Sequence, residues 1–275
     1  MAIDILEPTE YLQFVDDDDA NEMGDFDIKE GLPWKVEKQI ELMKTFARGF
    51  MLITGEPGGG KDLFAVSTAA IFKYYFNRRV ILDFQPKKAF KAYTMLDGPM
   101  IVEIIKELAK QYKVRGVENS GDNKEFTQFM EEATKKWLLE GQGFDIFNKA
   151  VYYISELKPV AYNRNPMART NKFIGSLGTV WRHLDLLLMG THVYSNELDV
   201  KAFLQYAKLR TKCSQTMKQG VIVANIYRGQ FAGPDFVVSN IAMKPLVWTV
   251  DGLEPREFLG GKRFVDLYKT KHMGF

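Results

Sequence analysis

The sequence predicts an α/β domain with three layers, in which helices cover both faces of a mainly parallel central sheet. Short apolar runs of strand length alternate with longer stretches whose apolar residues recur every three or four positions. A glycine-rich turn joins the first apolar run directly to the longest early helical pattern. With 275 residues, of which 46% are hydrophobic, the chain is long enough to bury the core of such a domain.

The elements of this domain follow in order along the chain. Helical spacing predicts a helix over residues 34–47, and FMLIT predicts the first strand. After the glycine turn, LFAVSTAAIFKYYF predicts a helix and RRVILDF, residues 78–84, a second strand. Residues 99–141 predict a small helical insertion between core strands, with a pair of ordinary crossover helices as the alternative.

The second half of the chain supplies the remaining strands. We predict strands at KAVYYISE (149–156), LDLLLMG, VIVANIYRG (221–229), PLVWTV (245–250) and FVDLYKTKH (264–272). ELDVKAFLQYAKLRTKCSQ is predicted to be a helix with a basic end. LDLLLMG is expected to lie between the FMLIT strand and the KAVYYISE strand.

Charge is distributed unevenly along the chain, although its sum is only +2. Residues 1–31 contain 11 acidic side chains and one basic side chain, whereas residues 157–275 contain 17 basic and 8 acidic ones. We therefore divide the chain into an acidic arm, residues 1–31, and a basic domain, residues 32–275. The arm is a solubilising tail, a cover for a neighbouring subunit or a cover for the protein's own basic groove. The basic face is either a polyanion-binding surface or a solvated one.

Composition and termini exclude several classes of protein. Cys213 is the only cysteine, which excludes an intrachain disulfide and a multi-cysteine zinc site. The N-terminal sequence lacks the features of a signal peptide, and no apolar run reaches the roughly 18 to 20 residues that cross a bilayer. We expect a cytoplasmic protein without a membrane partner.

The turn after FMLIT has the pattern G-x-x-x-x-G-K between a strand and a helix, which predicts a nucleotide site. Glycines let backbone N–H groups surround a phosphate, the helix N-terminus adds positive potential, and Lys61 supplies a charge to the β and γ phosphates. We assign ATP to Gly55, Glu56, Pro57, Gly58, Gly59, Gly60, Lys61, Asp62 and Leu63.

Two residues depart from the usual pattern of such a site. Asp62 stands where a Ser or Thr hydroxyl normally meets Mg²⁺, and Ser155 stands where an aspartate normally ends the acidic strand. A carboxylate can bind Mg²⁺ directly or through water, and a serine hydroxyl can do so through water. We therefore predict that Asp62 and Ser155 share the magnesium ion, with the total charge of the site kept.

The acidic strand also provides the candidate general base. Glu156 follows Ser155, where a glutamate polarises the attacking water in P-loop ATPases. Thr191 and His192 end the LDLLLMG strand and are the candidates for sensing the γ-phosphate; a core or capping role for His192 is the alternative.

Arginines late in the chain are candidates for a residue that reaches the nucleotide of a neighbouring subunit. Arg182 and Arg210 are the first candidates, and Arg169 and Arg228 are the others.

The order of these features resembles that of the additional-strand P-loop ATPases. Within them, residues 45–275 look most like the phage and viral ATPases of the FtsK/HerA and zonula occludens toxin-like kind. The resemblance implies an ATP-hydrolysing motor that packages or translocates DNA, gripping its backbone independently of sequence. It also implies a homo-oligomeric ring in the host cytoplasm or on the virion, with a capsid portal or vertex protein as a partner.

Other functions remain open at this point. The departures at Asp62 and Ser155 allow a hydrolysis-poor nucleotide-binding protein that serves virion structure or assembly. A small-molecule or nucleotide kinase shares the loop, but the arginines here follow the acidic strand instead of forming a lid.

Overall fold

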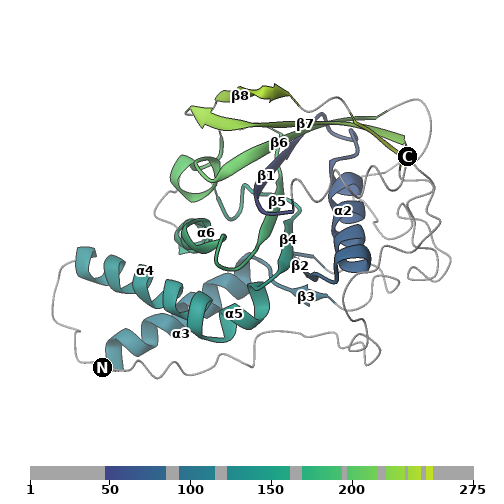
Figure 1. Cartoon of the computed structure of the whole chain (residues 1–275). Helices are drawn as coiled ribbons and strands as arrows, with labels where there is room; N and C mark the ends of the chain where they lie inside the picture. Colours follow the sequence, from purple (N-terminus) through teal and green to yellow (C-terminus); the bar gives the residue numbers. More distant parts are fainter. Residues whose placement is uncertain are drawn as a thin grey trace.

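The computed structural model describes residues 47–84, 93–114, 123–161, 169–193, 197–215, 221–232, 235–242 and 246–249. The acidic arm, nearly all of the helix predicted at 34–47 and the strand predicted at 264–272 lie outside these ranges. In the described part, one mixed sheet runs through the molecule, with helix α2 on one face and α3 to α6 on the other (Figure 1).

The sheet begins with six parallel strands in the order β3-β2-β4-β5-β1-β6. Their bounds are β1 Gly49–Thr54, β2 Arg79–Leu82, β3 Thr94–Met95, β4 Ala150–Ile154, β5 Leu187–Thr191 and β6 Ala207–Gln215. Antiparallel strands β7 (Val221–Ala232), β8 (Asp235–Ala242) and β9 (Leu246–Thr249) continue the sheet beyond β6. The predicted place of LDLLLMG, between the first strand and the acidic strand, is confirmed because β5 pairs with both β1 and β4.

Strand β1 is buried on both faces, as expected for a central parallel strand. Met51 and Ile53 pack with α2 (Lys61–Phe76), whereas Phe50 and Leu52 join the core on the opposite face. That opposite face is covered by α3 (Gly98–Val114), α4 (Asn123–Glu140), α5 (Gln142–Phe147), α6 (Arg169–Val180) and the π-helical turn η4 (Val200–Leu204). None of the helices in the described residues is long and apolar enough to cross a membrane.

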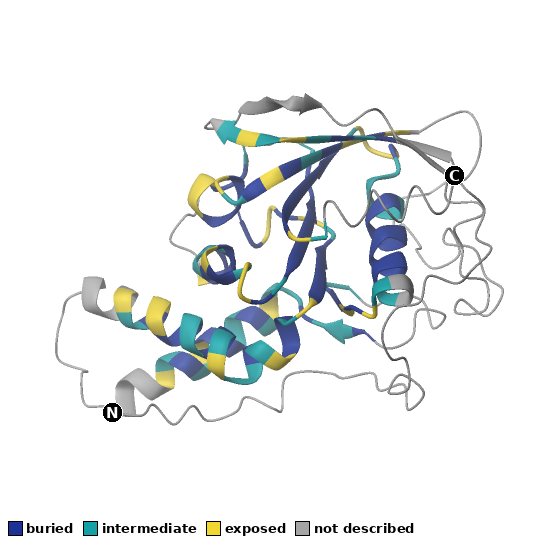
Figure 2. Ribbon diagram, viewed as in Figure 1, coloured by how far each residue is buried: buried dark blue, intermediate teal, exposed yellow. Residues whose placement is uncertain are grey.

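Helices α3, α4 and α5 occupy the stretch predicted as an insertion, and their inner sides belong to the main core. Trp137 of α4 lies with its ring centroid 6.3 Å from Phe147 of α5 and 6.1 Å from Phe173 of α6. Phe147 in turn contacts Tyr152 of β4 at 5.9 Å. The buried side of these helices faces the sheet and the exposed side faces away (Figure 2). Such packing against the sheet is typical of ordinary crossover helices, the alternative to an insertion. The division of the chain into an arm at residues 1–31 and a domain at 32–275 stays a prediction.

The predicted helix with a basic end is wrong. Apart from the short turn η4, this segment forms β6, in which Leu209, Thr211 and Cys213 are buried while Lys208 and Lys212 are exposed. Alternation with period two is the pattern of a strand, and pairing with β1 and β7 on both sides overrides the helical propensity of the segment.

The amino-terminal edge of the sheet is held by a buried arginine. Arg78 donates hydrogen bonds to the carbonyl oxygens of Ala47 and Asp185 at 2.7 and 2.9 Å, and to the Asp185 carboxylate at 3.0 Å. Arg48 pairs with the same carboxylate from the surface. The arginine therefore ties the start of β1 to the turn before β5, the two strands on which the site described next depends.

Candidate nucleotide site

The carboxyl ends of β2, β4, β5 and β1 lie at one edge of the sheet because these neighbouring strands run parallel. The residues that follow them are Asp83, Ser155, His192 and Gly55. Open α/β sheets bind their ligands at this edge. The fold thus brings most of the predicted site residues together.

The glycine-rich turn after β1 depends on backbone conformations that favour glycine. Gly58 and Gly60 have φ angles of 75° and 83°, and Gly60 precedes the first residue of α2. At Gly55, with φ of 149°, a Cβ atom would overlap the carbonyl oxygen of Cys213 on β6. The turn is therefore built by glycines and lies tightly against β6.

Lys61 holds the turn from within. Its Nζ donates hydrogen bonds to the carbonyl oxygens of Gly55 at 2.8 Å and Glu56 at 3.0 Å. The ammonium group is thus placed inside a glycine-lined turn at the N-terminus of a helix of 16 residues. A positive charge, a helix N-terminus and glycine backbone together match the chemistry of a phosphate, so the turn fits the phosphates of a nucleotide.

Asp62 contacts the acidic strand rather than standing apart from it. Tyr153 of β4 donates its hydroxyl to Asp62 Oδ1 at 2.5 Å. Tyr153 and Ser155 are two residues apart in sequence, so their side chains project from the same face of the chain. The hydrogen bond therefore fixes the Asp62 carboxylate on the side of β4 where Ser155 lies.

The structure adds a carboxylate that the sequence analysis missed. Asp83, directly after β2, accepts hydrogen bonds from the backbone N–H of Ser155 at 2.9 Å and from its hydroxyl at 3.0 Å. The sequence signal was its position at the end of the VIL strand, but only the pairing of β2 with β4 brings it to the site. An acid is thus present beside Ser155, supplied by the neighbouring strand.

Burial raises the pKa of Asp83 from its usual value to about 6. The two hydrogen bonds from Ser155 oppose this effect, and the nearby negative charge of Asp62 adds to it. Hydrogen bonds tie both carboxylates to the end of β4, Asp62 through Tyr153 and Asp83 through Ser155. Mg²⁺ prefers one or two carboxylates together with water and substrate phosphates, and this pair of oxygen donors fits that requirement.

Glu156 sits between two residues whose backbones are fixed. The carbonyl of Ser155 accepts a hydrogen bond from the Thr191 hydroxyl, and the N–H of Leu157 donates to the Thr191 carbonyl at 3.0 Å. The Leu157 side chain packs on Gly190, where a Cβ would overlap it. Thr191, predicted as a phosphate sensor, therefore uses its hydroxyl to hold β4; its sensing role stays a prediction.

His192 is almost fully buried and lies between two carboxylates. Its backbone N–H donates to Ile53 of β1 at 3.0 Å, which fixes it beside the strand that leads into the glycine turn. Its Nε2 is 3.1 Å from Glu197 Oε2, and its Nδ1 is 3.6 Å from Glu156 Oε1. Glu197 was also missed by the sequence analysis, because no motif connects it with the strand end.

The decisive observation is the combination of the Lys61 turn after β1 with a strand inserted between β1 and the acidic strand. The fold is that of a P-loop NTPase. No family model and no curated protein matches the chain.

Solved structures of similar fold exist. One is the N-terminal domain of the zonular occludens toxin from Neisseria meningitidis, with 18% identity over 81% of this chain and 99% of that one, at a TM-score of 0.44. The genome packaging NTPase B204 of Sulfolobus turreted icosahedral virus 2, in complex with AMPPCP, has 13% identity over 66% and 93%, at 0.39. A KaiC-like protein from Pyrococcus horikoshii has 9% identity over 74% and 87%, at 0.34.

The four candidate arginines come from different elements of the fold. Arg182 lies in the turn before β5, and so at the opposite edge of the sheet, where it stacks on Trp181 at 5.2 Å. Arg210 pairs with Leu52 in the sheet and shares the face opposite α2. Arg169 begins α6 and Arg228 lies in β7. A role for any of them at a neighbouring subunit stays a prediction.

Proposed function

We propose that the protein is a P-loop ATPase that hydrolyses ATP to package or translocate DNA. The observation that carries the hydrolytic part is the placement of Glu156 at the same sheet edge as the Lys61 turn, with Thr191 fixing the residues on either side of it. A carboxylate whose flanking backbone is fixed beside a phosphate site is what activation of a water molecule requires.

The chain's own residues have distinct parts in this reaction. Lys61 exchanges the carbonyls of Gly55 and Glu56 for phosphate oxygens when ATP enters the turn. Glu156 takes a proton from water as the water oxygen bonds to the γ-phosphorus, and the bond to the bridging oxygen breaks to release ADP. Bound Mg²⁺ neutralises phosphate charge. Asp62 and Asp83 would hold it, with Ser155 orienting Asp83 by its two hydrogen bonds.

Binding and turnover of ATP test this proposal separately. Lys61→Ala should weaken ATP binding at least about tenfold in a fluorescence titration, because it removes the charge inside the turn. Glu156→Gln should keep ATP affinity but slow single-turnover hydrolysis about 100-fold, the lower range for loss of general base catalysis. Glu140→Gln, an exposed change at the end of α4, is the control. Normal turnover by Glu156→Gln would overturn the assignment of the base.

The second candidate function is nucleotide binding without efficient hydrolysis, in a structural or assembly protein of a virion. The specific observation in its favour is Asp62, whose carboxylate stands close to the phosphates and is held there by Tyr153. Negative charge at this point opposes phosphate binding unless Mg²⁺ is present. Tight binding of ATP with turnover that no nucleic acid stimulates would favour this second function.

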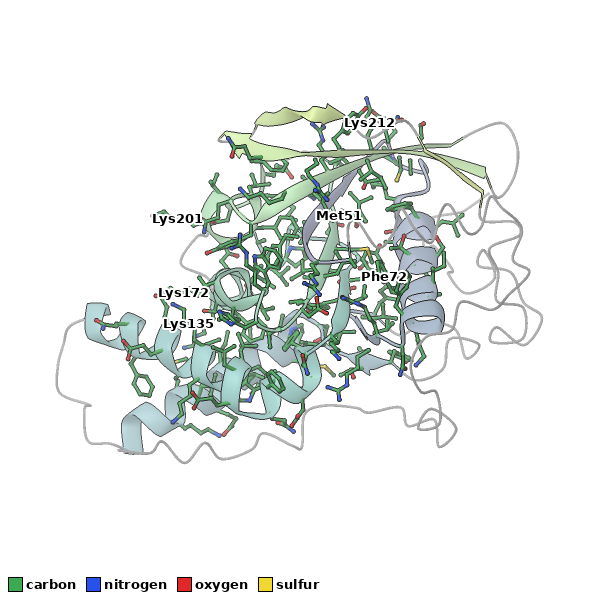
Figure 3. The ribbon with its side chains drawn as sticks, viewed as in Figure 1. Met51, Phe72, Lys135, Lys172, Lys201 and Lys212 are labelled. Carbon is green, nitrogen blue, oxygen red and sulfur yellow. The ribbon has the colours of Figure 1, made fainter. Side chains whose placement is uncertain are left out.

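The DNA part of the proposal is supported by lysines on the flank of the molecule that carries α4, α6 and η4. Lys135, Lys172 and Lys201 follow one another along this flank (Figure 3), and the three elements that carry them pack against each other. Exposed Lys208 continues the series onto β6. Lysines spaced along a surface contact phosphates without reading bases, as a motor acting on any sequence requires.

Charge reversal on this flank tests for DNA contact. Lys201→Glu with Lys208→Glu should weaken binding of duplex DNA and lower the slope of log affinity against log salt by about two units, since two phosphate contacts are lost. Lys106→Glu, on α3 beside Glu103, serves as the matched reversal elsewhere. Equal effects of the two changes would show that this flank is not the DNA contact.

A homo-oligomeric ring and a capsid portal or vertex partner stay part of the proposal. Measuring the mass of the protein with ATP and DNA tests whether such an assembly forms.

A further inference from the structure

The buried imidazole of His192 connects two carboxylates that come from different parts of the chain. Glu156 follows β4, and Glu197 precedes η4. The side chain of His192 is 3% exposed, whereas those of Glu156 and Glu197 are 60% and 36% exposed. Lys158 lies 3.4 Å from Glu197 on its outer side. These are the charged groups that the described residues place around the ring.

The distances define what the ring can do. With its Nε2–H donated to Glu197 at 3.1 Å, the imidazole directs Nδ1 toward Glu156 Oε1 at 3.6 Å. Nδ1 is buried and has no hydrogen-bond partner among the described residues. A bare nitrogen lone pair facing a carboxylate is repulsive, so the contact becomes favourable only when one proton lies between the two groups.

The Glu156 side chain is the movable member of this group. The backbones on both sides of it are hydrogen-bonded to Thr191, while its carboxylate is largely exposed. A small rotation about its side-chain bonds closes the 3.6 Å gap to hydrogen-bond distance. His192, by contrast, is fixed by the backbone of β1 and by Glu197.

We propose that Glu197 and His192 form a proton relay behind Glu156, in which His192 accepts the proton that Glu156 takes from the attacking water. This rests on the proposed function, since Glu156 must first act as the base. His192 takes part in the reaction only by exchanging a proton with Glu156. Glu197 is a positioning residue, because it sets the tautomer of His192.

The proton balance is simple. Water loses one proton to Glu156 as its oxygen bonds to the γ-phosphorus and ADP departs with the electrons of the broken bond. The protonated Glu156 passes this proton to Nδ1 of His192, giving an imidazolium that donates to Glu156 and Glu197 at once. Exposed Glu197 then takes the Nε2 proton and passes it to solvent, which leaves the Glu156 carboxylate and a neutral ring with its proton on Nδ1. The starting tautomer returns when Nδ1 gives that proton to solvent past the exposed Glu156 side chain and Nε2 takes one from solvent through Glu197, so that one turnover releases one proton. Such an arrangement of carboxylate, histidine and acid–base group is a recurrent means of orienting a proton acceptor.

The relay is tested by the pH dependence of single-turnover hydrolysis at saturating Mg²⁺ and ATP. In the unmodified protein, the pH profile of the rate should show an inflection, with a lower rate on its acid side, because a ring that already carries both protons cannot accept another. Glu197→Gln should move this inflection to lower pH, since the carboxylate that stabilises the imidazolium is gone. His192→Gln should remove the inflection and lower the plateau rate about tenfold or more.

Two further variants separate chemistry from folding. His192→Ala should regain activity when imidazole is added to the buffer, a response that a merely structural histidine does not give. His183→Gln changes an exposed histidine in the turn before β5 and should leave the profile unaltered. Should the changes at His192 prevent folding, Glu197→Gln still carries the test because Glu197 is partly exposed.

The outcomes distinguish the relay from the function on which it rests. If the unmodified protein hydrolyses ATP and Glu156→Gln does not, but the inflection stays in place in Glu197→Gln, the relay is wrong and the ATPase stands. If the unmodified protein does not hydrolyse ATP, or Glu156→Gln does so normally, the proposed function fails and the relay fails with it. A shifted inflection together with rescue by imidazole supports both.

Discussion

Replacing Asp83 by asparagine should make the protein more stable at neutral pH. Burial raises the pKa of Asp83 from 3.8 to about 6. The unfolded chain therefore loses this proton first as the pH rises from about 4 to about 6, and the free energy of unfolding falls over that window. A shift of about two units corresponds to about 3 kcal/mol. The asparagine side chain of the variant cannot accept both hydrogen bonds of Ser155, which costs about 1 kcal/mol. The net gain at pH 8 is about 2 kcal/mol.

Urea unfolding between pH 4 and pH 8 in the presence of EDTA measures this effect. Asp83→Asn should be about 0.5 kcal/mol less stable than the unmodified protein at pH 4, where the unfolded chain has already lost part of this proton, and more stable at pH 8, so that the two curves cross. Asp145→Asn, the same chemical change at an exposed position on α5, should leave the curve of the unmodified protein in place. Parallel curves for the unmodified protein and Asp83→Asn would refute the reasoning.

Three other substitutions probe the scaffold of the site. Gly55→Ala forces a Cβ into the backbone of β6 and should lower the melting temperature and ATP affinity together, measured on the same sample. Gly190→Ala displaces the leucine after Glu156 and should slow hydrolysis more than it weakens ATP binding; an unchanged single-turnover rate would contradict this. Arg78→Met leaves two carbonyls without their donor and a half-buried carboxylate with only the exposed Arg48, and should cost about 3 kcal/mol in urea unfolding. Arg48→Ala on the same carboxylate should cost less than about 1 kcal/mol because Arg48 is 67% exposed.

The strands and the P-loop could be predicted from sequence because their signals are local. An apolar run, a glycine turn and a helix directly after it can be read without knowing what lies beside them, and β1 and α2 follow that pattern. Strand β6 shows the limit of such reasoning. Lys208 and Arg210 are good helix formers, and their alternation with buried Leu209 becomes decisive only when β1 and β7 provide partners on both sides.

Part of the candidate site could also be predicted because its signals are local. Lys61, Asp62 and Glu156 belong to motifs with fixed spacing, so each is found from one segment of sequence. Asp83 and Glu197 are brought in by tertiary structure, the first by the pairing of β2 with β4 and the second by the chain that leads into η4. A pattern within one segment cannot identify such residues, because their role depends on contacts with residues of other elements.

The position of Asp83 changes how the departures from the usual P-loop pattern should be understood. From the sequence we predicted that Asp62 and Ser155 share the magnesium ion, so that Asp62 makes up for the aspartate missing at position 155. In the structure the Ser155 hydroxyl already donates to Asp83 Oδ2 at 3.0 Å. A carboxylate at position 155 would replace this donor by a second acceptor and set two negative charges against each other in a buried place, which costs stability unless a cation or a shared proton lies between them. The serine is therefore the hydrogen-bonding partner of Asp83, and the carboxylate at this point follows β2 instead of β4.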